Sequence, residues 1–245
     1  MTAALDTRPR SSALDRDTAM ELAKTEYERV VTLFEGLSAQ DWAKSTDCPA
    51  WDVRAMAAHM LGMAEMSASI REAMRQTKAA EKAGGVMIDA LTSLQVSERA
   101  GMSATAIAAR YAEVAPRAVK GRRRTPWFMR RTKAGAQVMN GREEMWSLGF
   151  LTDVIMTRDP WMHRVDISRA VGVPMELTAD HDGVIVDDVV REWAARHGQP
   201  FTLRLTGPAG GRWGSGGPEL EFDAVEFCRA LSGRGHAPLQ TEVPF

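Results

Sequence analysis

Residues 158–166 read RDPWMHRVD, and this stretch decides the fold prediction. Asp159 lies four residues before His163, so a helix would place the carboxylate and the imidazole on one face. A second stretch, CPAWDVRAMAAH at 48–59, ends in His59. A second helix carrying His59 can complete a three-ligand site for a divalent metal with open coordination positions. The spacing therefore predicts a metal site between helices.

Helical patterns fill most of the chain before Gly172. We expect residues 1–14 to be disordered, and Asp15 or Asp17 to cap a helix that ends at Gly36. A second helix begins near Trp51, and its apolar stripe contains His59 and continues to Ile70 and Met74. Further helical patterns cover 86–96, 103–119, 140–156 and 159–171. The patterns together predict a helical first part of about 170 residues.

The pattern changes after Gly172. A helix over about 180–197 is followed by alternating residues at 201–206, which predict a strand, and by a glycine-rich connection at 207–217. Residues 220–222 suggest another extended piece, Asp223 can cap a short helix to Leu231, and 241–245 suggest a last extended segment. We predict an α+β fold that is mainly α, with a metal-binding helical bundle at 15–172 and a small C-terminal α/β domain at 173–245.

Composition limits the classes of function. The 245 residues are 44% apolar and 26% charged, with a formal net charge of −1. This balance gives no general attraction to nucleic acid or to a membrane surface. We find no secretion signal and no apolar run long enough for a membrane helix. The two cysteines, Cys48 and Cys228, are too few for a disulfide framework. We therefore expect a cytoplasmic protein without a membrane partner, and the sequence leaves its oligomeric state open.

Residues 48–59 resemble the CPGWxVRx4H signature of the mycothiol-dependent maleylpyruvate isomerase family, actinobacterial relatives of the DinB-like four-helix bundles. Residues 158–172 resemble the second metal motif of this family, and residues 231–234 and 241–245 resemble the end of its C-terminal domain. The resemblance covers nearly the whole chain. It implies a DinB-like four-helix bundle followed by a small α/β domain, a metal held by His59, Asp159 and His163, and mycothiol as cofactor.

Asp159 departs from the family pattern. The best-known members carry a glutamate four residues before the second histidine, whereas Asp159 is one methylene shorter and is followed by Pro160. Proline is favoured at the first helical position, so Asp159 can instead be an N-cap that bonds backbone N–H groups. Asp166, three residues after His163, would then be the reserve carboxylate. The sequence leaves both roles of Asp159 open.

We predict a divalent-metal enzyme, with zinc expected, that uses mycothiol on a small electrophilic substrate as an isomerase or an S-transferase. Arg234 and Arg229 are candidate catalytic residues that would pair with a substrate carboxylate. The remaining histidines, His181, His197 and His236, stay outside the predicted site.

Two alternatives remain at this point. The first is a non-catalytic metal-binding or regulatory protein on the same scaffold. The second, less favoured, is nucleic-acid binding through the basic segment 117–133, in which arginines and lysines alternate with Trp127 and Phe128. We favour a solvated loop there, or a rim that attracts a small anion, because the net charge is close to zero.

Overall fold

The computed structural model of the chain describes residues 9–235, 239 and 241–245. The chain forms two compact units. The bundle unit consists of residues 16–126 and 159–174, and the mixed unit of residues 9–15, 127–158 and 175–245. The chain passes from the mixed unit to the bundle unit inside helix α8 (Met156–Val171). The domain boundaries at 15–172 and 173–245 stay a prediction.

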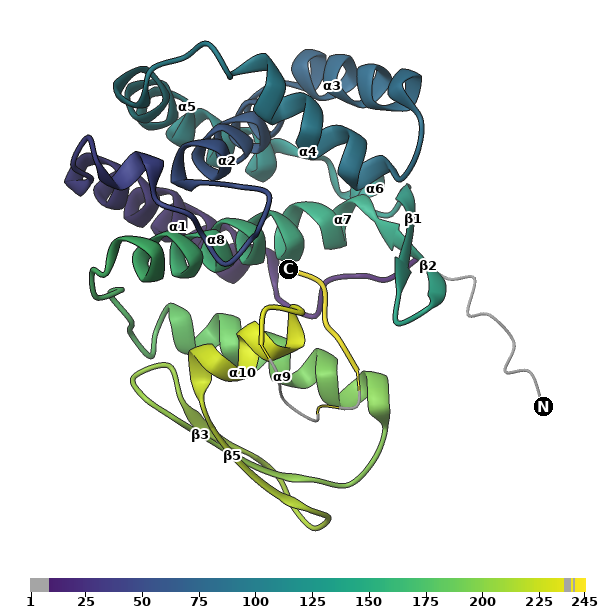
Figure 1. Ribbon diagram of the computed structural model, residues 1–245. Coiled ribbons are helices and arrows are strands. Elements are labelled where there is room, and N and C mark those ends of the chain that lie inside the picture. Colours follow the sequence, from purple (N-terminus) through teal and green to yellow (C-terminus); the bar gives the residue numbers. More distant parts are fainter. Residues whose placement is uncertain (1–8, 236–238, 240) are drawn as a thin grey trace. The chain divides into compact units, whose positions relative to one another are not determined.

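Long helices make up the bundle unit. Its central helices are α1 (Arg16–Gly36), α2 (Val53–Ala68), α5 (Ala104–Arg124) and residues 159–171 of α8 (Figure 1). Two further helices, α3 (Ile70–Ala83) and α4 (Met87–Glu98), pack along α2, and the short turn η1 (Asp41–Ala43) precedes it. The core contains the buried residues Phe34, Trp42, Met56, Met60, Leu61, Ile107, Tyr111 and Ile167.

Capping side chains set where these helices start. Asp52 accepts a hydrogen bond from the Ala55 backbone N–H at 2.7 Å, and Ser103 caps α5 in the same way. Gly121 of α5 allows a close approach to α2, because a Cβ at this position would overlap with the Ser67 carbonyl oxygen. These features bring α2 and α5 together in a fixed register, and α2 carries His59.

A buried ion pair joins α8 to α1. The Arg164 guanidinium donates from Nε to Glu26 Oε1 at 2.8 Å and from Nη2 to Glu26 Oε2 at 3.0 Å. Both side chains are almost completely buried. A bidentate pair of this kind fixes both distance and orientation. It therefore positions the helix on which Asp159 and His163 lie.

The mixed unit contains both small sheets. Strands β1 (Lys133–Met139) and β2 (Arg142–Ser147) form an antiparallel hairpin, with Asn140 and Gly141 at positive φ in its turn. A second sheet has the order β4 (Gly211–Gly214), β3 (Thr202–Thr206), β5 (Glu219–Asp223), in which β3 pairs antiparallel with β4 and parallel with β5. The helices of this unit are α6 (Trp127–Arg130), α7 (Leu148–Phe150), α9 (Asp182–His197) and α10 (Ala224–Leu231), with a π-helical turn η2 (Leu151–Ile155).

The fold class predicted from sequence, α+β and mainly α, is confirmed. The helix expected near 180–197, the strand at 201–206 and the helix capped by Asp223 are all present. The glycine-rich run at 207–217 was expected to be a connection, but it contains strand β4, so only residues 207–210 connect β3 to β4 and residues 215–218 lead to β5. The structure assigns no strand to 241–245, and His236 lies outside the described residues.

Two predicted helices were wrong in part. The pattern at 140–156 suggested a helix, but residues 142–147 form β2, because Asn140-Gly141 makes the hairpin turn. The second helix, α2, ends at Ala68, and the hydroxyl of Ser69 caps α3 by accepting from the Glu72 N–H at 3.3 Å. Ile70 and Met74 therefore lie on the exposed side of α3 rather than in the core.

The basic segment 117–133 is not the loop that we favoured. Residues 117–124 continue α5 to Arg124, and Arg122 is almost completely buried.

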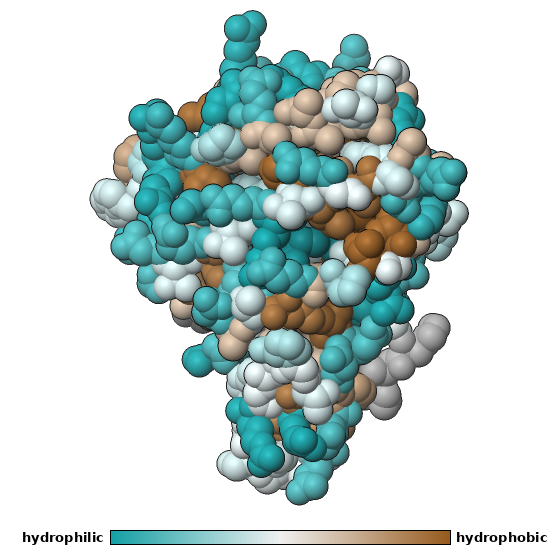
Figure 2. Space-filling view, turned by 90° about the vertical axis from the view of Figure 1, so that its left-hand side faces the viewer, coloured by the Kyte–Doolittle hydropathy of each residue, from teal (hydrophilic) through white to brown (hydrophobic). Residues whose placement is uncertain are grey.

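On the face drawn in Figure 2, hydrophilic side chains predominate and apolar ones form separate patches. Among the described residues, each helix is too short or too polar to cross a membrane.

Candidate metal centre

The bundle unit brings together the three residues that the sequence predicted as ligands. His59 comes from α2, and Asp159 and His163 come from α8. The Asp159 Oδ1 atom lies 3.5 Å from His59 Nε2 and 3.3 Å from His163 Nε2. One ligand atom from each residue lies within 4.8 Å of the other two. Both histidines are buried, so the cluster faces little competition from water.

Asp159 lies in the first turn of α8, three residues after Met156, and not at the N-cap position. The helix begins at Met156 and follows directly on the π-helical turn η2, so Pro160 is an interior residue. The alternative that Asp159 is an N-cap is therefore wrong. Proline has no backbone N–H, so a proline inside a helix leaves one helical hydrogen bond unmade. The π-helical turn η2, in which the hydrogen-bond pattern also departs from that of an α-helix, directly precedes α8. The Asp159 side chain is directed at both imidazoles.

The second nitrogen of each imidazole also has a partner. His59 Nδ1 lies 2.7 Å from Gln95 Oε1, and His163 Nδ1 lies 3.2 Å from Asp166 Oδ2. An acceptor at Nδ1 favours the tautomer with the proton there, which leaves the Nε2 lone pair for a metal. Two imidazole nitrogens and one carboxylate oxygen form a donor set that suits zinc and similar divalent ions. The residues present therefore fit such an ion.

The sequence suggested Asp166 as an alternative ligand to Asp159, but the structure places the two carboxylates at different nitrogens of the His163 ring. The Asp166 side chain is fully buried and lies at Nδ1 of His163, whereas Asp159 lies at Nε2. Cys48 Sγ lies 3.8 Å from the same Asp166 carboxylate, so Cys48, His163 and Asp166 form a second group of possible ligands. Both groups share His163. In the first group Asp159 is the possible ligand and Asp166 orients the His163 ring through Nδ1, an arrangement common at metal sites.

Charges within the cluster compensate one another. Burial alone would raise the pKa of Asp159, but the His163 and His59 imidazoles outweigh it and hold that pKa well below its usual range. Burial alone would lower the pKa of His163, yet the Asp159 and Asp166 carboxylates raise it to about 9. A metal that binds at Nε2 must therefore displace a proton from His163 near neutral pH.

Trp51 covers the two imidazoles. Its ring centroid lies 5.1 Å from that of His59 and 5.9 Å from that of His163. The two imidazoles are 5.2 Å apart and nearly perpendicular. Trp51 is half-buried, so it forms part of the wall around the ligand atoms. The sequence alone did not reveal this position of Trp51, although the residue belongs to the same motif as His59.

Gln95 was not recognised from sequence. It lies on α4, one turn after the buried Leu91, and is itself fully buried. A glutamine on the apolar face of a helix is the signal that could have identified it, because buried polar groups require partners. The sequence does not reveal the partner of Gln95, which is His59, 36 residues earlier in the chain.

The two predicted catalytic arginines lie in the mixed unit. Arg229 is a buried residue of α10, and Arg234 lies in the turn after this helix and is half-buried. Arg229 Nη2 donates to the Arg234 carbonyl oxygen at 3.3 Å, and its Nε donates to Glu226 at 3.3 Å. These bonds hold the two residues close together. Their role toward a substrate stays a prediction.

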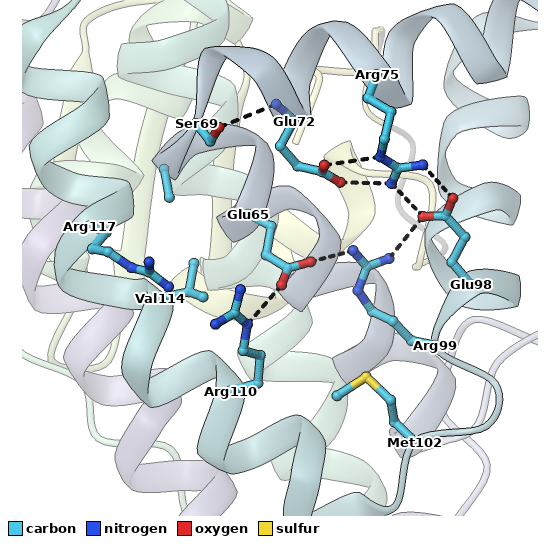
Figure 3. Close-up of a pocket in the computed structure, with 11 residues that line it drawn as sticks. Glu65, Ser69, Glu72, Arg75, Glu98, Arg99, Met102, Arg110, Val114 and Arg117 are labelled. Carbon is cyan, nitrogen blue, oxygen red and sulfur yellow. Dashed lines mark hydrogen bonds and ion pairs between the residues drawn. The ribbon is translucent and has the colours of Figure 1, made fainter.

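A charged pocket of about 560 Å³ lies elsewhere in the bundle unit (Figure 3). Glutamates and arginines alternate around it: Glu65 pairs with Arg99 at 2.5 Å and with Arg110 at 3.0 Å. Arg75 joins Glu98 at 2.6 Å and Glu72 at 2.7 Å. The hydrogen bond from Arg75 lowers the pKa of Glu72 to about 2. Opposite charges therefore largely cancel at this pocket.

Carboxylates pair with some of the arginines in the basic segment. Arg117 pairs with Glu113 at 3.0 Å and Arg123 with Glu21 at 2.7 Å. In the mixed unit, Arg130 forms an ion pair with Asp153. Phosphate binding requires guanidinium groups that are available to the backbone of the nucleic acid. These pairs occupy some of the guanidinium groups that the nucleic-acid alternative requires, and that alternative stays the less favoured prediction.

Comparison with known proteins identifies the family of the chain. Residues 23–168 match the family model described as "Mycothiol maleylpyruvate isomerase N-terminal domain". The chain is similar to a solved structure, "Crystal structure of the mycothiol-dependent maleylpyruvate isomerase", with 16% identity and a TM-score of 0.59, over 94% of this chain and 95% of that one. A histidine-to-alanine mutant of that isomerase matches with 15% identity and the same TM-score and coverage. Comparison with curated proteins gives no match.

Proposed function

The chain belongs to the mycothiol maleylpyruvate isomerase family, and from this premise we propose that it is a metal-dependent enzyme that uses mycothiol on a small electrophilic substrate. The observation that carries the proposal is the convergence of His59, Asp159 and His163 in a buried cluster. The isomerase of similar fold is described as mycothiol-dependent. The reaction is either isomerisation, as in that protein, or transfer of the thiol sulfur.

In this proposal His59, Asp159 and His163 hold the divalent metal, with zinc expected from the donor set. A bound metal of this kind would lower the pKa of a thiol and so supply a sulfur nucleophile at neutral pH. The Asp159 carboxylate offsets part of the positive charge that the ion brings into a buried site.

The surrounding residues prepare the ligands. Gln95 and Asp166 orient the two imidazoles through Nδ1, and Trp51 limits the access of water to them. Preorganised ligands reduce the free energy that binding must spend on ordering side chains. Arg229 and Arg234 remain the proposed partners of a substrate carboxylate, because a guanidinium matches a carboxylate with two parallel hydrogen bonds.

Turnover with mycothiol tests this proposal. Protein purified without added metal is first analysed for its metal content, then assayed on a panel of electrophiles with and without mycothiol. We expect product only with mycothiol, and activity that falls at least about 100-fold in His163→Ala, because a ligand is lost. His197→Ala is the matched control, since His197 lies on α9 outside the cluster.

The thiol balance separates the two reactions. An isomerase returns all of the mycothiol, whereas an S-transferase consumes one thiol for each product molecule. Metal binding without thiol-dependent turnover on the whole panel would contradict the proposal. That outcome would favour the non-catalytic metal-binding protein as the function of the scaffold.

A further inference from the structure

A chain of buried amides leads from His59 to the surface of the bundle unit. Gln95 Oε1 lies 2.7 Å from His59 Nδ1, and Gln95 Nε2 donates to Gln76 Oε1 at 2.9 Å. Gln76 Nε2 then donates to Glu72 Oε1 at 2.9 Å and to the Gly62 carbonyl oxygen at 3.3 Å. Both glutamines are fully buried. A flip of either side-chain amide, which exchanges its oxygen and nitrogen, would therefore leave a buried polar group without a suitable partner.

The outer end of this network sets its direction. An ionised carboxylate and a backbone carbonyl only accept hydrogen bonds, so Gln76 must present its NH₂ group to Glu72 and Gly62. Its oxygen then faces Gln95, which must donate. The Gln95 oxygen is left for His59, and the proton between them must therefore be on His59 Nδ1.

We propose that Gln95 and Gln76 are positioning residues that hold the His59 imidazole in the tautomer with its proton on Nδ1 and its Nε2 lone pair directed at Asp159 and His163. The consequence for metal affinity rests on the proposed function, whereas the tautomer itself does not. Gln95 at 2.7 Å competes for the ring proton against Asp159, which lies 3.5 Å from Nε2. The shorter contact and the fixed direction of the network both place the proton on Nδ1.

The backbone around Gln95 is arranged to keep it in place. A Cβ at Gly62, three residues after His59 on α2, would lie 2.5 Å from Gln95 Cγ and 2.8 Å from Gln95 Cβ. Only glycine therefore leaves room for the Gln95 side chain. Arg99 donates to the Gln95 carbonyl oxygen at 2.8 Å and pairs with Glu65, which holds this turn of α4 against α2.

The outer end of the network lies at the charged pocket. Figure 3 shows Glu72 between Ser69 and Arg75, with both of its carboxylate oxygens turned toward the Arg75 guanidinium. This ion pair keeps the Glu72 carboxylate ionised, as the low pKa of Glu72 indicates. An ionised Glu72 can only accept from Gln76, and the direction of the network follows from it.

Nitrogen NMR of the His59 ring in the metal-free protein tests the proposal, under conditions in which the imidazole is neutral. We expect a single tautomer with the proton on Nδ1 in the wild type, and a mixture in Gln95→Met, which removes the acceptor but keeps the length of the side chain. Gly62→Ala should act in the same direction, because it displaces Gln95.

Leu91→Ala is the matched control, since it weakens the packing of α4 one turn away without removing a hydrogen bond of the network. It should lower stability and leave the tautomer unchanged. Zinc titration should then give a Kd about 10–100-fold weaker in Gln95→Met than in Leu91→Ala.

Retention of the Nδ1–H tautomer in Gln95→Met would overturn the proposal, as would an equal shift of the tautomer in Leu91→Ala. A tautomer that depends on Gln95 in a protein that binds no zinc would support the positioning role and contradict the metal site. The two failures are therefore distinguishable.

Discussion

Asp159 shows how a small change in a motif is accommodated at the scale of single residues. Its carboxylate is one methylene shorter than the glutamate of the family pattern, yet Oδ1 lies within 3.5 Å of both imidazole nitrogens. The sequence singled out the three residues that converge in this cluster, because their types and spacing carry the information. It did not predict Gln95, because the partner of a buried amide depends on how α4 packs against α2.

Asp159→Asn tests the role of the carboxylate charge. Asparagine keeps the shape of the side chain but removes the anion, so we expect zinc affinity to fall by more than about 100-fold, beyond the range typical of an outer partner. Asp159→Glu is the control that keeps the charge and should retain most of the affinity. Equal zinc affinity of the Asn variant and the wild type, measured by competition with a chromophoric chelator, would remove Asp159 from the ligand set.

The pH dependence of zinc binding follows from His163. Its pKa is raised from 6.5 to about 9, so below that value the metal must displace a proton. Affinity should therefore increase about tenfold for each pH unit toward pH 9 and then level off. In the metal-free protein the same raised pKa stabilises the fold fully below about pH 6.5, and this contribution is lost as pH rises through about 9. Affinity that is flat between pH 6 and 8 would contradict the assignment of His163.

At the scale of elements, the ion pair of Glu26 with Arg164 sets the position of α8. The two proposed ligands on α8 can meet His59 of α2 only if both helices keep their positions in the bundle unit. The sequence predicted the helices but not this pair, since the two residues are 138 positions apart. The hairpin at 133–147 shows a local signal that was misread. The apolar pattern at 140–156 predicted a helix, but the turn-forming pair Asn140-Gly141 directs residues 142–147 into a strand.

Glu26→Ala should destabilise the protein strongly. It leaves the Arg164 guanidinium buried without its carboxylate partner, which costs on the order of 3–5 kcal/mol. Glu28→Ala is the matched control on the same helix, because its pair with Lys24 is exposed and should contribute little. Denaturant unfolding of the metal-free proteins measures both. Similar unfolding midpoints of the two variants would contradict the role assigned to the buried pair.

At the scale of the whole molecule, the order of helical and mixed segments was predictable, but the composition of the mixed unit was not. Residues from three distant segments meet in one ion network, in which Glu144 of β2 pairs with Arg10 at 3.0 Å and with Arg196 of α9 at 2.9 Å. Arg10 also pairs with Glu192. Local patterns of hydrophobicity carry no information about such long-range pairs. The structure therefore groups residues 127–158 with the end of the chain.

Glu144→Ala tests whether zinc binding in the bundle unit is independent of the ion network in the mixed unit. It removes the acceptor shared by Arg10, Arg196 and the Trp146 indole, so we expect a loss of about 1–3 kcal/mol in the free energy of unfolding. Zinc affinity should stay at the wild-type value, because the proposed ligands and the residues that orient them lie in the bundle unit. A parallel loss of zinc affinity in the folded variant would show that the metal site depends on the mixed unit.

The stoichiometry of metal binding tests the central claim most directly. Metal-free wild type, His59→Ala and His163→Ala are titrated with zinc by calorimetry, and circular dichroism records the helical content of each protein. We predict one zinc ion per chain in the wild type and no stoichiometric binding in either variant, with helical content largely unchanged because the bundle has a large apolar core of its own. Full zinc binding by either variant would remove that histidine from the centre and contradict the account.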